Sequence, residues 1–190
     1  MNSLQVINHN TVIVDEKVTL RSNHYNLLDE EGRSLGQIIE RRRFWHYLLK
    51  RYFSPFTLSL VDLDNHTVAQ LHKGWSFLAP SYRIIDNNDK LIAFIKSRVT
   101  LLKSKADMFL PNGQLLATME GNWKAWNFSI TASDGKVLAN IDKKFNGVMK
   151  ELFTTADKYV VSINPEISDC DVRVAILFVA CAIDMILKED

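Results

Sequence analysis

Residues 126–141 of the chain read WNFSITASDGKVLANI, and this stretch decides the fold. Every second residue from Trp126 to Ile130 is aromatic or aliphatic, which is the pattern of a strand that buries one face. Ser133-Asp134-Gly135 follows as a turn, because Asp bonds its own backbone and Gly accepts a positive φ. A second strand then begins at Leu138 with an aliphatic, a small, a variable and an aliphatic residue. The stretch therefore predicts a β-hairpin.

The same hairpin pattern recurs along the chain. The small residues that mark the second strands are Gly36, Ala69, Ala93, Ala117 and Ala139, at intervals of 33, 24, 24 and 22 residues. Such an interval corresponds to one hairpin per repeat. Five hairpins supply ten strands, and Leu4–Val14 and Lys158–Ile163 are expected to add two more. About twelve antiparallel strands in one small domain need closure, or two stacked sheets, to hide their edges.

The apolar segment from Val172 to Leu187 predicts a helix that is hydrophobic on every side. Its uninterrupted apolar stretch, Val174 to Ile183, has ten residues, whereas a membrane span needs about 20. We predict a mainly β fold, in which about twelve antiparallel strands form a closed barrel around this buried hydrophobic C-terminal α-helix. Residues 1–190 are expected to form one domain. The alternatives are a sandwich with the helix on one face, or a helix that crosses a membrane.

Composition excludes several function classes. The 190 residues include 23 Lys and Arg against 22 Asp and Glu, so a net charge of +1 gives no electrostatic case for nucleic acid as a partner. With only Cys170 and Cys181, a disulfide framework is excluded. The chain contains neither an HExxH nor a GxSxG motif and no phosphate-binding glycine loop, so we expect no enzyme.

The histidines and the first residues of the chain carry no further signal. His66 and His72 are six residues apart, which is not a metal-binding spacing, and the other histidines are scattered. We therefore expect no metal or catalytic role for them. The first ten residues do not form a secretory signal, so we expect a cytoplasmic location that allows peripheral contact with a membrane.

A basic and aromatic segment accounts for the longest interval between repeats. Residues 41–53 read RRRFWHYLLKRYF, and a helix there would place the aromatic and leucine side chains opposite the basic ones. This composition is typical of an interfacial membrane contact or a partner groove. The alternative is that the aromatic residues plug a barrel end while the charges are solvated. The predicted lipid-binding residues are Arg41, Arg42, Arg43, Trp45, Lys50 and Arg51, and a second basic group comprises Lys96, Arg98, Lys103 and Lys105.

Carboxylates gather before the C-terminal helix and suggest a cation site. Several such oxygens near one strand are suitable ligands for Ca²⁺, although their spacing does not match an EF-hand loop. The alternative is that they cap the helix, since acidic residues stabilise a helix N-terminus. These carboxylates are Asp157, Glu166, Asp169 and Asp171.

Three segments of this region resemble the C-terminal region of the phospholipid scramblase family. They are residues 145–159 (FNGVMKELFTTADKY), 169–173 (DCDVR) and 180–184 (ACAID). The hairpin repeats also resemble those of LURP-one-related proteins and of the Tubby C-terminal domain. The resemblance implies a twelve-stranded barrel around a hydrophobic C-terminal helix, as the repeats predict independently.

For function, the resemblance implies calcium-linked phospholipid translocation, as in scramblases, or phosphoinositide or protein binding, as in Tubby-like proteins. Thr155 stands where the scramblase pattern has its first acid, whereas Asp157, Asp169 and Asp171 match the later acids. The resemblance therefore makes Asp157, Asp169 and Asp171 the candidate calcium ligands. We expect a non-enzymatic domain that binds anionic phospholipid or phosphoinositide at a membrane surface. The alternatives are a calcium-dependent scramblase with its C-terminal helix in the membrane, and a soluble protein-interaction module without lipid contact.

Overall fold

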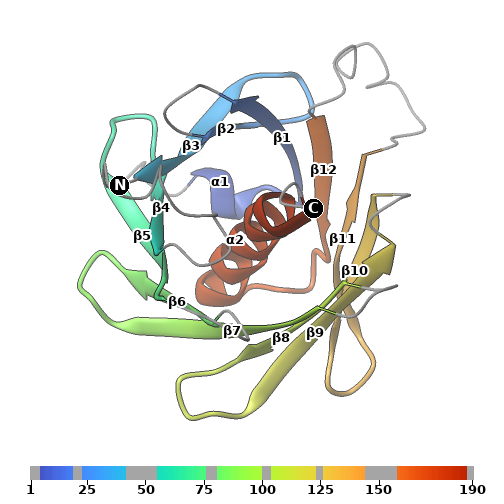
Figure 1. Ribbon diagram of the computed structural model, residues 1–190. Helices are drawn as coiled ribbons and strands as arrows, with labels where there is room; N and C mark the ends of the chain where they lie inside the picture. Colours follow the sequence, from blue (N-terminus) through green and yellow to red (C-terminus); the bar gives the residue numbers. More distant parts are fainter. Residues whose placement is uncertain are drawn as a thin grey trace.

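The computed structural model describes residues 5–18, 23–41, 55–75, 81–99, 104–122, 126–143 and 158–187. Within these ranges the chain forms twelve strands and two helices (Figure 1). The strands are β1 (Thr11–Val18), β2 (Asn23–Leu28), β3 (Ser34–Arg41), β4 (Phe56–Val61), β5 (Thr67–Lys73), β6 (Ser81–Asp86), β7 (Leu91–Val99), β8 (Ser104–Phe109), β9 (Leu115–Asn122), β10 (Asn127–Ala132), β11 (Val137–Asp142) and β12 (Lys158–Ile163). The helices are α1 (Gln5–Asn8) and α2 (Cys170–Leu187).

The strands form a closed antiparallel barrel, which confirms the predicted fold. Each strand pairs with its neighbours in sequence, and β1 pairs with β12 to close the wall. In that closing pair Val12 lies opposite Val161 and Val14 lies opposite Tyr159. Closure leaves no strand edge of this barrel unpaired, so the sandwich alternative is not formed.

All five predicted hairpins have the same turn geometry. In each turn the amide of the fourth residue donates to the carbonyl of the first, at 2.9–3.2 Å between nitrogen and oxygen. The fourth residue has a positive φ, which explains why Gly or a short polar residue stands there. These residues are Gly32, Asn65, Asp89, Gly113 and Gly135.

The predicted strand from Leu4 to Val14 is wrong in its first half. Gln5–Asn8 forms the short helix α1, and β1 begins only at Thr11. Val6 and Ile7 are both only 2% exposed. Adjacent residues of a strand point to opposite faces, whereas a helical turn can direct both side chains into the same apolar core.

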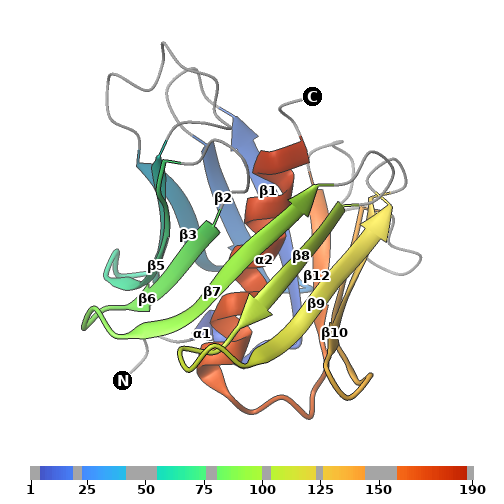
Figure 2. The same cartoon turned by 60° about the horizontal axis from the view of Figure 1, so that its bottom comes forward.

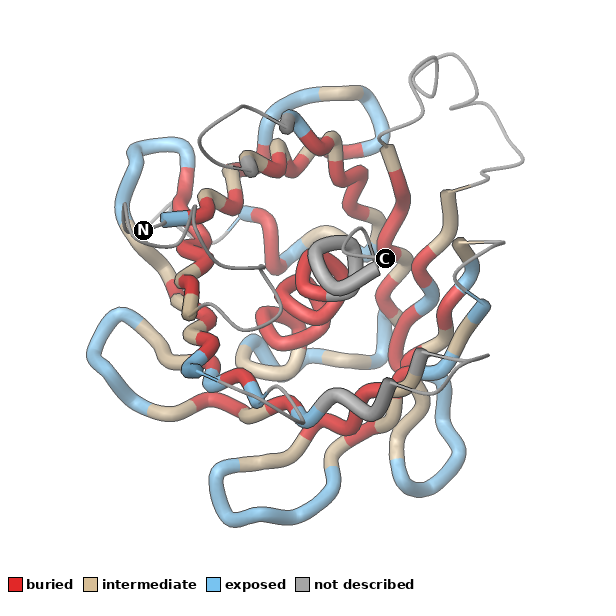
Figure 3. Tube along the Cα trace, viewed as in Figure 1, coloured by how far each residue is buried: buried red, intermediate tan, exposed pale blue. Residues whose placement is uncertain are grey.

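Helix α2 passes through the centre of the barrel (Figures 1 and 2). Every residue from Arg173 to Ala182 is buried, and the inward residues of the surrounding strands complete one apolar core (Figure 3). The predicted buried central helix is therefore confirmed. Among the helices that the structure describes, none combines the length and hydropathy of a membrane span.

The barrel has two different ends. The five tight turns and the start of α2 lie at one end, which we call the hairpin end and which is lowest in Figure 2. The opposite end is the far end, where β3 ends at Arg41 and α2 ends at Leu187. The strand ends that flank the segments outside the described ranges also lie at the far end.

Gly121 in β9 tests how closely the wall is packed. A Cβ atom there would lie 2.3 Å from the Asn127 carbonyl oxygen and 2.7 Å from the Phe128 Cα. Because those atoms belong to the backbone of the paired strand β10, we expect Gly121→Ala to lower the free energy of unfolding by about 1–3 kcal/mol. Urea denaturation followed by circular dichroism measures the change. Gly74→Ala is the control, since nothing lies within 4 Å of its added Cβ, and equal midpoints for the two variants would contradict the prediction.

Candidate functional site

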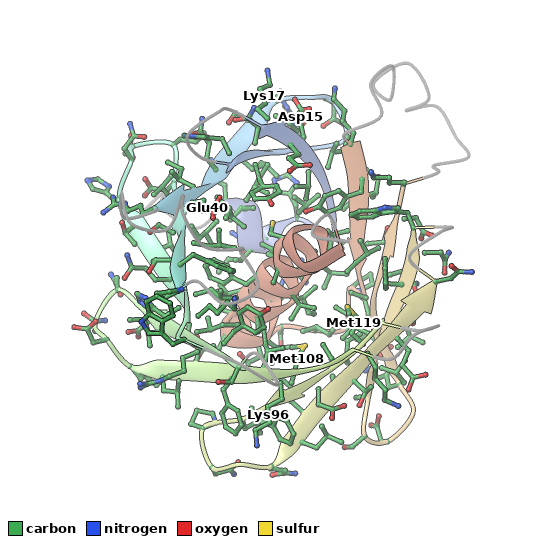
Figure 4. The ribbon with its side chains drawn as sticks, in the orientation of Figure 1. Asp15, Lys17, Glu40, Lys96, Met108 and Met119 are labelled. Carbon is green, nitrogen blue, oxygen red and sulfur yellow. The ribbon has the colours of Figure 1, made fainter. Side chains whose placement is uncertain are left out.

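One of the six predicted lipid-binding residues, Arg41, lies within the described residues. It is the last residue of β3 and is exposed at the far end of the barrel. The preceding Glu40 is buried and points to the inside of the wall (Figure 4). This alternation directs the Arg41 side chain outward. The other five predicted residues, Arg42, Arg43, Trp45, Lys50 and Arg51, lie outside the described ranges, so lipid binding by this segment stays a prediction.

Among the described side chains of the second basic group, Lys96 is exposed and lies on a pair of aromatic rings. Phe94 of β7 and Phe109 of β8 stack with ring centroids 5.0 Å apart. The Lys96 ammonium lies 5.7 Å and 5.3 Å from the two ring centroids and points away from the barrel (Figure 4). Cation–π contacts of this kind hold a charge at a surface. The Lys105 ammonium is paired with the Glu120 carboxylate, whereas Lys103 lies beyond the described part of the chain.

The acids predicted for calcium have other roles in the part that the structure describes. Asp169 caps α2, because its Oδ1 accepts the amides of Asp171 at 2.8 Å and Val172 at 3.3 Å. The Asp171 carboxylate lies 3.5 Å from the Lys90 ammonium. Calcium takes six to eight oxygen ligands, so these two engaged carboxylates do not form a calcium site by themselves. Asp157 lies outside the described residues, and calcium binding by the three acids stays a prediction.

The start of α2 is fixed to the N-terminal region by a buried arginine. The Arg173 guanidinium donates to the carbonyl of Ile167 at 2.9 Å and to the carbonyl of His9 at 2.5 Å. It also donates to the Asn10 side-chain oxygen at 3.1 Å. Burial lowers the pKa of Arg173 below its usual value. An arginine side chain nevertheless stays charged in proteins. This cation therefore serves the fold and is not free for a ligand.

A pocket of about 410 Å³ lies at the hairpin end, between the β4–β5 turn, the β6–β7 turn and the start of α2. Its polar lining is dominated by Asp62, His66, Asp86 and Asp171. The Asp86 carboxylate accepts the backbone amides of Lys90 and Asn88, and these hydrogen bonds lower the pKa of Asp86. Asp86 is therefore ionised at neutral pH, and the pocket is rich in carboxylates.

Sequence reasoning missed the neighbours of His66. His72 is the histidine nearest to it in sequence, but the His72 ring bonds the Thr57 hydroxyl at 2.9 Å, and burial lowers the pKa of His72. His66 instead lies beside the acids of its own turn, Asp62 and Asp64. The signal was the sequence Asp-x-Asp-x-His, whose three polar side chains belong to one tight turn and lie close together.

The model of the Scramblase family matches residues 10–189, which is nearly the whole chain. The chain belongs to the Scramblase family. Two yeast proteins are similar to the chain at low identity. A phospholipid scramblase family protein of Schizosaccharomyces pombe is 22% identical over 196 residues, which cover 89% of this chain and 50% of the relative. The altered inheritance rate of mitochondria protein 25 of Saccharomyces cerevisiae is 21% identical over 197 residues, which cover 85% of this chain and 60% of the relative.

A solved structure supports the fold of this Scramblase family member. The X-ray structure of an Arabidopsis thaliana protein superposes with a TM-score of 0.57 and covers 92% of this chain and 91% of its own. The two sequences are 12% identical, so this likeness concerns the fold alone. Because the chain spans only about half of the yeast relatives' lengths, it corresponds to a part of those proteins.

The capping role of Asp169 can be separated from a role of its charge. We expect Asp169→Ala to lower the free energy of unfolding by about 0.5–2 kcal/mol, because two α2 amides lose their acceptor. Asp169→Asn keeps an acceptor oxygen and is expected to lose only a few tenths of a kcal/mol. Urea denaturation in the presence of a calcium chelator measures both values. An equally large loss in both variants would show that the carboxylate charge, and not the cap, stabilises the protein.

Proposed function

We propose that this Scramblase family member is a non-enzymatic module that binds anionic phospholipid at the cytoplasmic surface of a membrane. The observation that carries the proposal is the exposed Arg41 at the far end of the barrel, where the basic and aromatic sequence 41–53 begins. Family membership and the name of the Schizosaccharomyces pombe relative support a role connected with phospholipid. Phosphoinositides are one class of anionic lipid that such a surface would accept.

The buried position of α2 favours a surface contact over insertion of that helix. The apolar side chains from Val174 to Ala182 already pack inside the barrel, so they offer no exposed apolar face to lipid. Each Lys or Arg near an anionic membrane adds about 1 kcal/mol of attraction. A cluster of arginines with a nearby Trp therefore supplies enough attraction for reversible binding.

A scramblase activity with α2 in the membrane is the alternative that the family name favours. It would require α2 to leave the barrel, which exposes the inner faces of the strands as well as the helix. Exposure of side chains such as Phe178 costs about 1.5–3 kcal/mol each, so this route needs a large compensating gain in lipid. A protein partner without lipid contact is the other alternative.

Co-sedimentation with liposomes tests the proposal. We expect the protein to pellet with phosphatidylserine vesicles and not with phosphatidylcholine vesicles, more strongly at low salt, because salt screens the attraction. Arg41→Glu combined with Arg42→Glu should weaken this binding by at least about tenfold. Parallel runs with calcium and with chelator show whether the cation contributes.

The matched control reverses two charges at the hairpin end, with Lys90→Glu and Lys136→Glu. Both lysines make exposed ion pairs, to Asp171 and Glu166 respectively, and exposed pairs contribute little to stability. This variant changes the net charge equally but should keep its affinity for the vesicles. An equal loss in both variants, or no pelleting of the unmodified protein under any condition, would contradict the proposal.

A further inference from the structure

The β4–β5 turn contains a buried carboxylate oxygen without a hydrogen-bond donor. Asp62 follows β4 directly, and its side chain is only 5% exposed. Its Oδ1 accepts the amides of Asp64 at 3.0 Å and His66 at 2.8 Å. Its Oδ2 is buried and has no hydrogen-bond partner in the described part of the chain. An ionised oxygen in such a position is costly unless a cation compensates it.

Comparison with the equivalent turns shows what is missing at Asp62. Asp29 begins the β2–β3 turn in the same way, but its second oxygen accepts a charged hydrogen bond from the Arg33 Nε at 2.6 Å. In the β6–β7 turn the residue at the Arg33 position is Lys90. In the β4–β5 turn this position holds His66, whose Nδ1 lies 3.5 Å from the Asp62 Oδ2. Histidine does not carry the permanent charge of Arg or Lys.

The same turn provides three ligand atoms for a cation. One carboxylate oxygen each of Asp62 and Asp64 and one ring nitrogen of His66 lie within 4.8 Å of one another. Asp64 and His66 are exposed, so an ion can reach the buried oxygen from solvent. Asp62 and His66 also line the pocket at the hairpin end, to which Asp86 adds negative charge, while Asp171 there is paired with Lys90. The surroundings therefore favour a cation.

We propose that Asp62, Asp64 and His66 bind a divalent first-row transition-metal ion, with Zn²⁺ as the best match. One imidazole nitrogen and two carboxylate oxygens are a ligand set for Zn²⁺, which takes such atoms at about 2.0–2.2 Å and leaves a fourth position to water. Ca²⁺ prefers six to eight oxygen ligands and fits this set poorly. Its three ligands are not among the acids predicted for calcium, although Asp171 lines the same pocket, and the site does not depend on lipid binding.

Zinc titration of the untagged protein, by calorimetry and by competition with a chromophoric chelator, tests the proposal. We expect one Zn²⁺ per chain, and an increase of the melting temperature with zinc, because the ion binds the folded turn. His66→Lys should weaken zinc binding by at least about tenfold. This variant places at position 66 the cation that Lys90 supplies in the neighbouring turn, so the loss of zinc binding is not due to unfolding.

Asp62→Asn and His72→Gln complete the test. Asp62→Asn keeps the oxygen that accepts the two turn amides but removes the negative charge, so it should also lose zinc binding. His72→Gln removes a histidine outside the cluster and should bind zinc as the unmodified protein does. The proposal is overturned if no saturable zinc binding is found, if His66→Lys binds zinc equally well, or if Ca²⁺ binds more tightly than Zn²⁺ in a His66-dependent manner.

Discussion

The fold depends on one constraint, which is that an α-helix with apolar side chains all around must be enclosed on every side. Residues Arg173 to Ala182 of α2 are all buried, and a single sheet or a second helix could cover only part of their surface. A closed wall of twelve strands covers all of it and removes the unpaired strand edges at the same time. The helix and the wall therefore each solve the burial problem of the other.

The wall could be predicted from the sequence because its information is local. Each hairpin repeats a turn in which a short polar residue or Gly takes a positive φ, so five independent signals agree on the same unit. α1 was missed because Val6 and Ile7 are too few to show a helical period, and only packing decides their conformation. The spacing of the histidines does not predict the cluster at Asp62, because the other members of the cluster are acids of the His66 turn. Burial of the Asp62 oxygen is a tertiary property that no spacing reveals.

The two proposed sites of this Scramblase family member lie at opposite ends of the barrel. The cation site is at the hairpin end, and the lipid-binding segment begins at the far end. Carboxylates dominate the pocket at the hairpin end, and the short turns hold them in fixed positions. The far end presents Arg41, at the start of the most basic sequence of the chain. Carboxylates thus gather in the pocket at one end of the barrel, and Arg41 lies at the other end.

The pairing of β1 with β12, together with the contact from Arg173 to His9 and Asn10, has a consequence for synthesis on the ribosome. The strand that closes the wall and the helix that fills it emerge after all the other strands. Until then the nascent chain can form separate hairpins, whose apolar inner faces have nothing to pack against. Final folding must therefore wait for α2 to leave the exit tunnel, and contacts between such distant residues make it slow. During this interval the apolar inner faces of the hairpins are most in need of protection by chaperones.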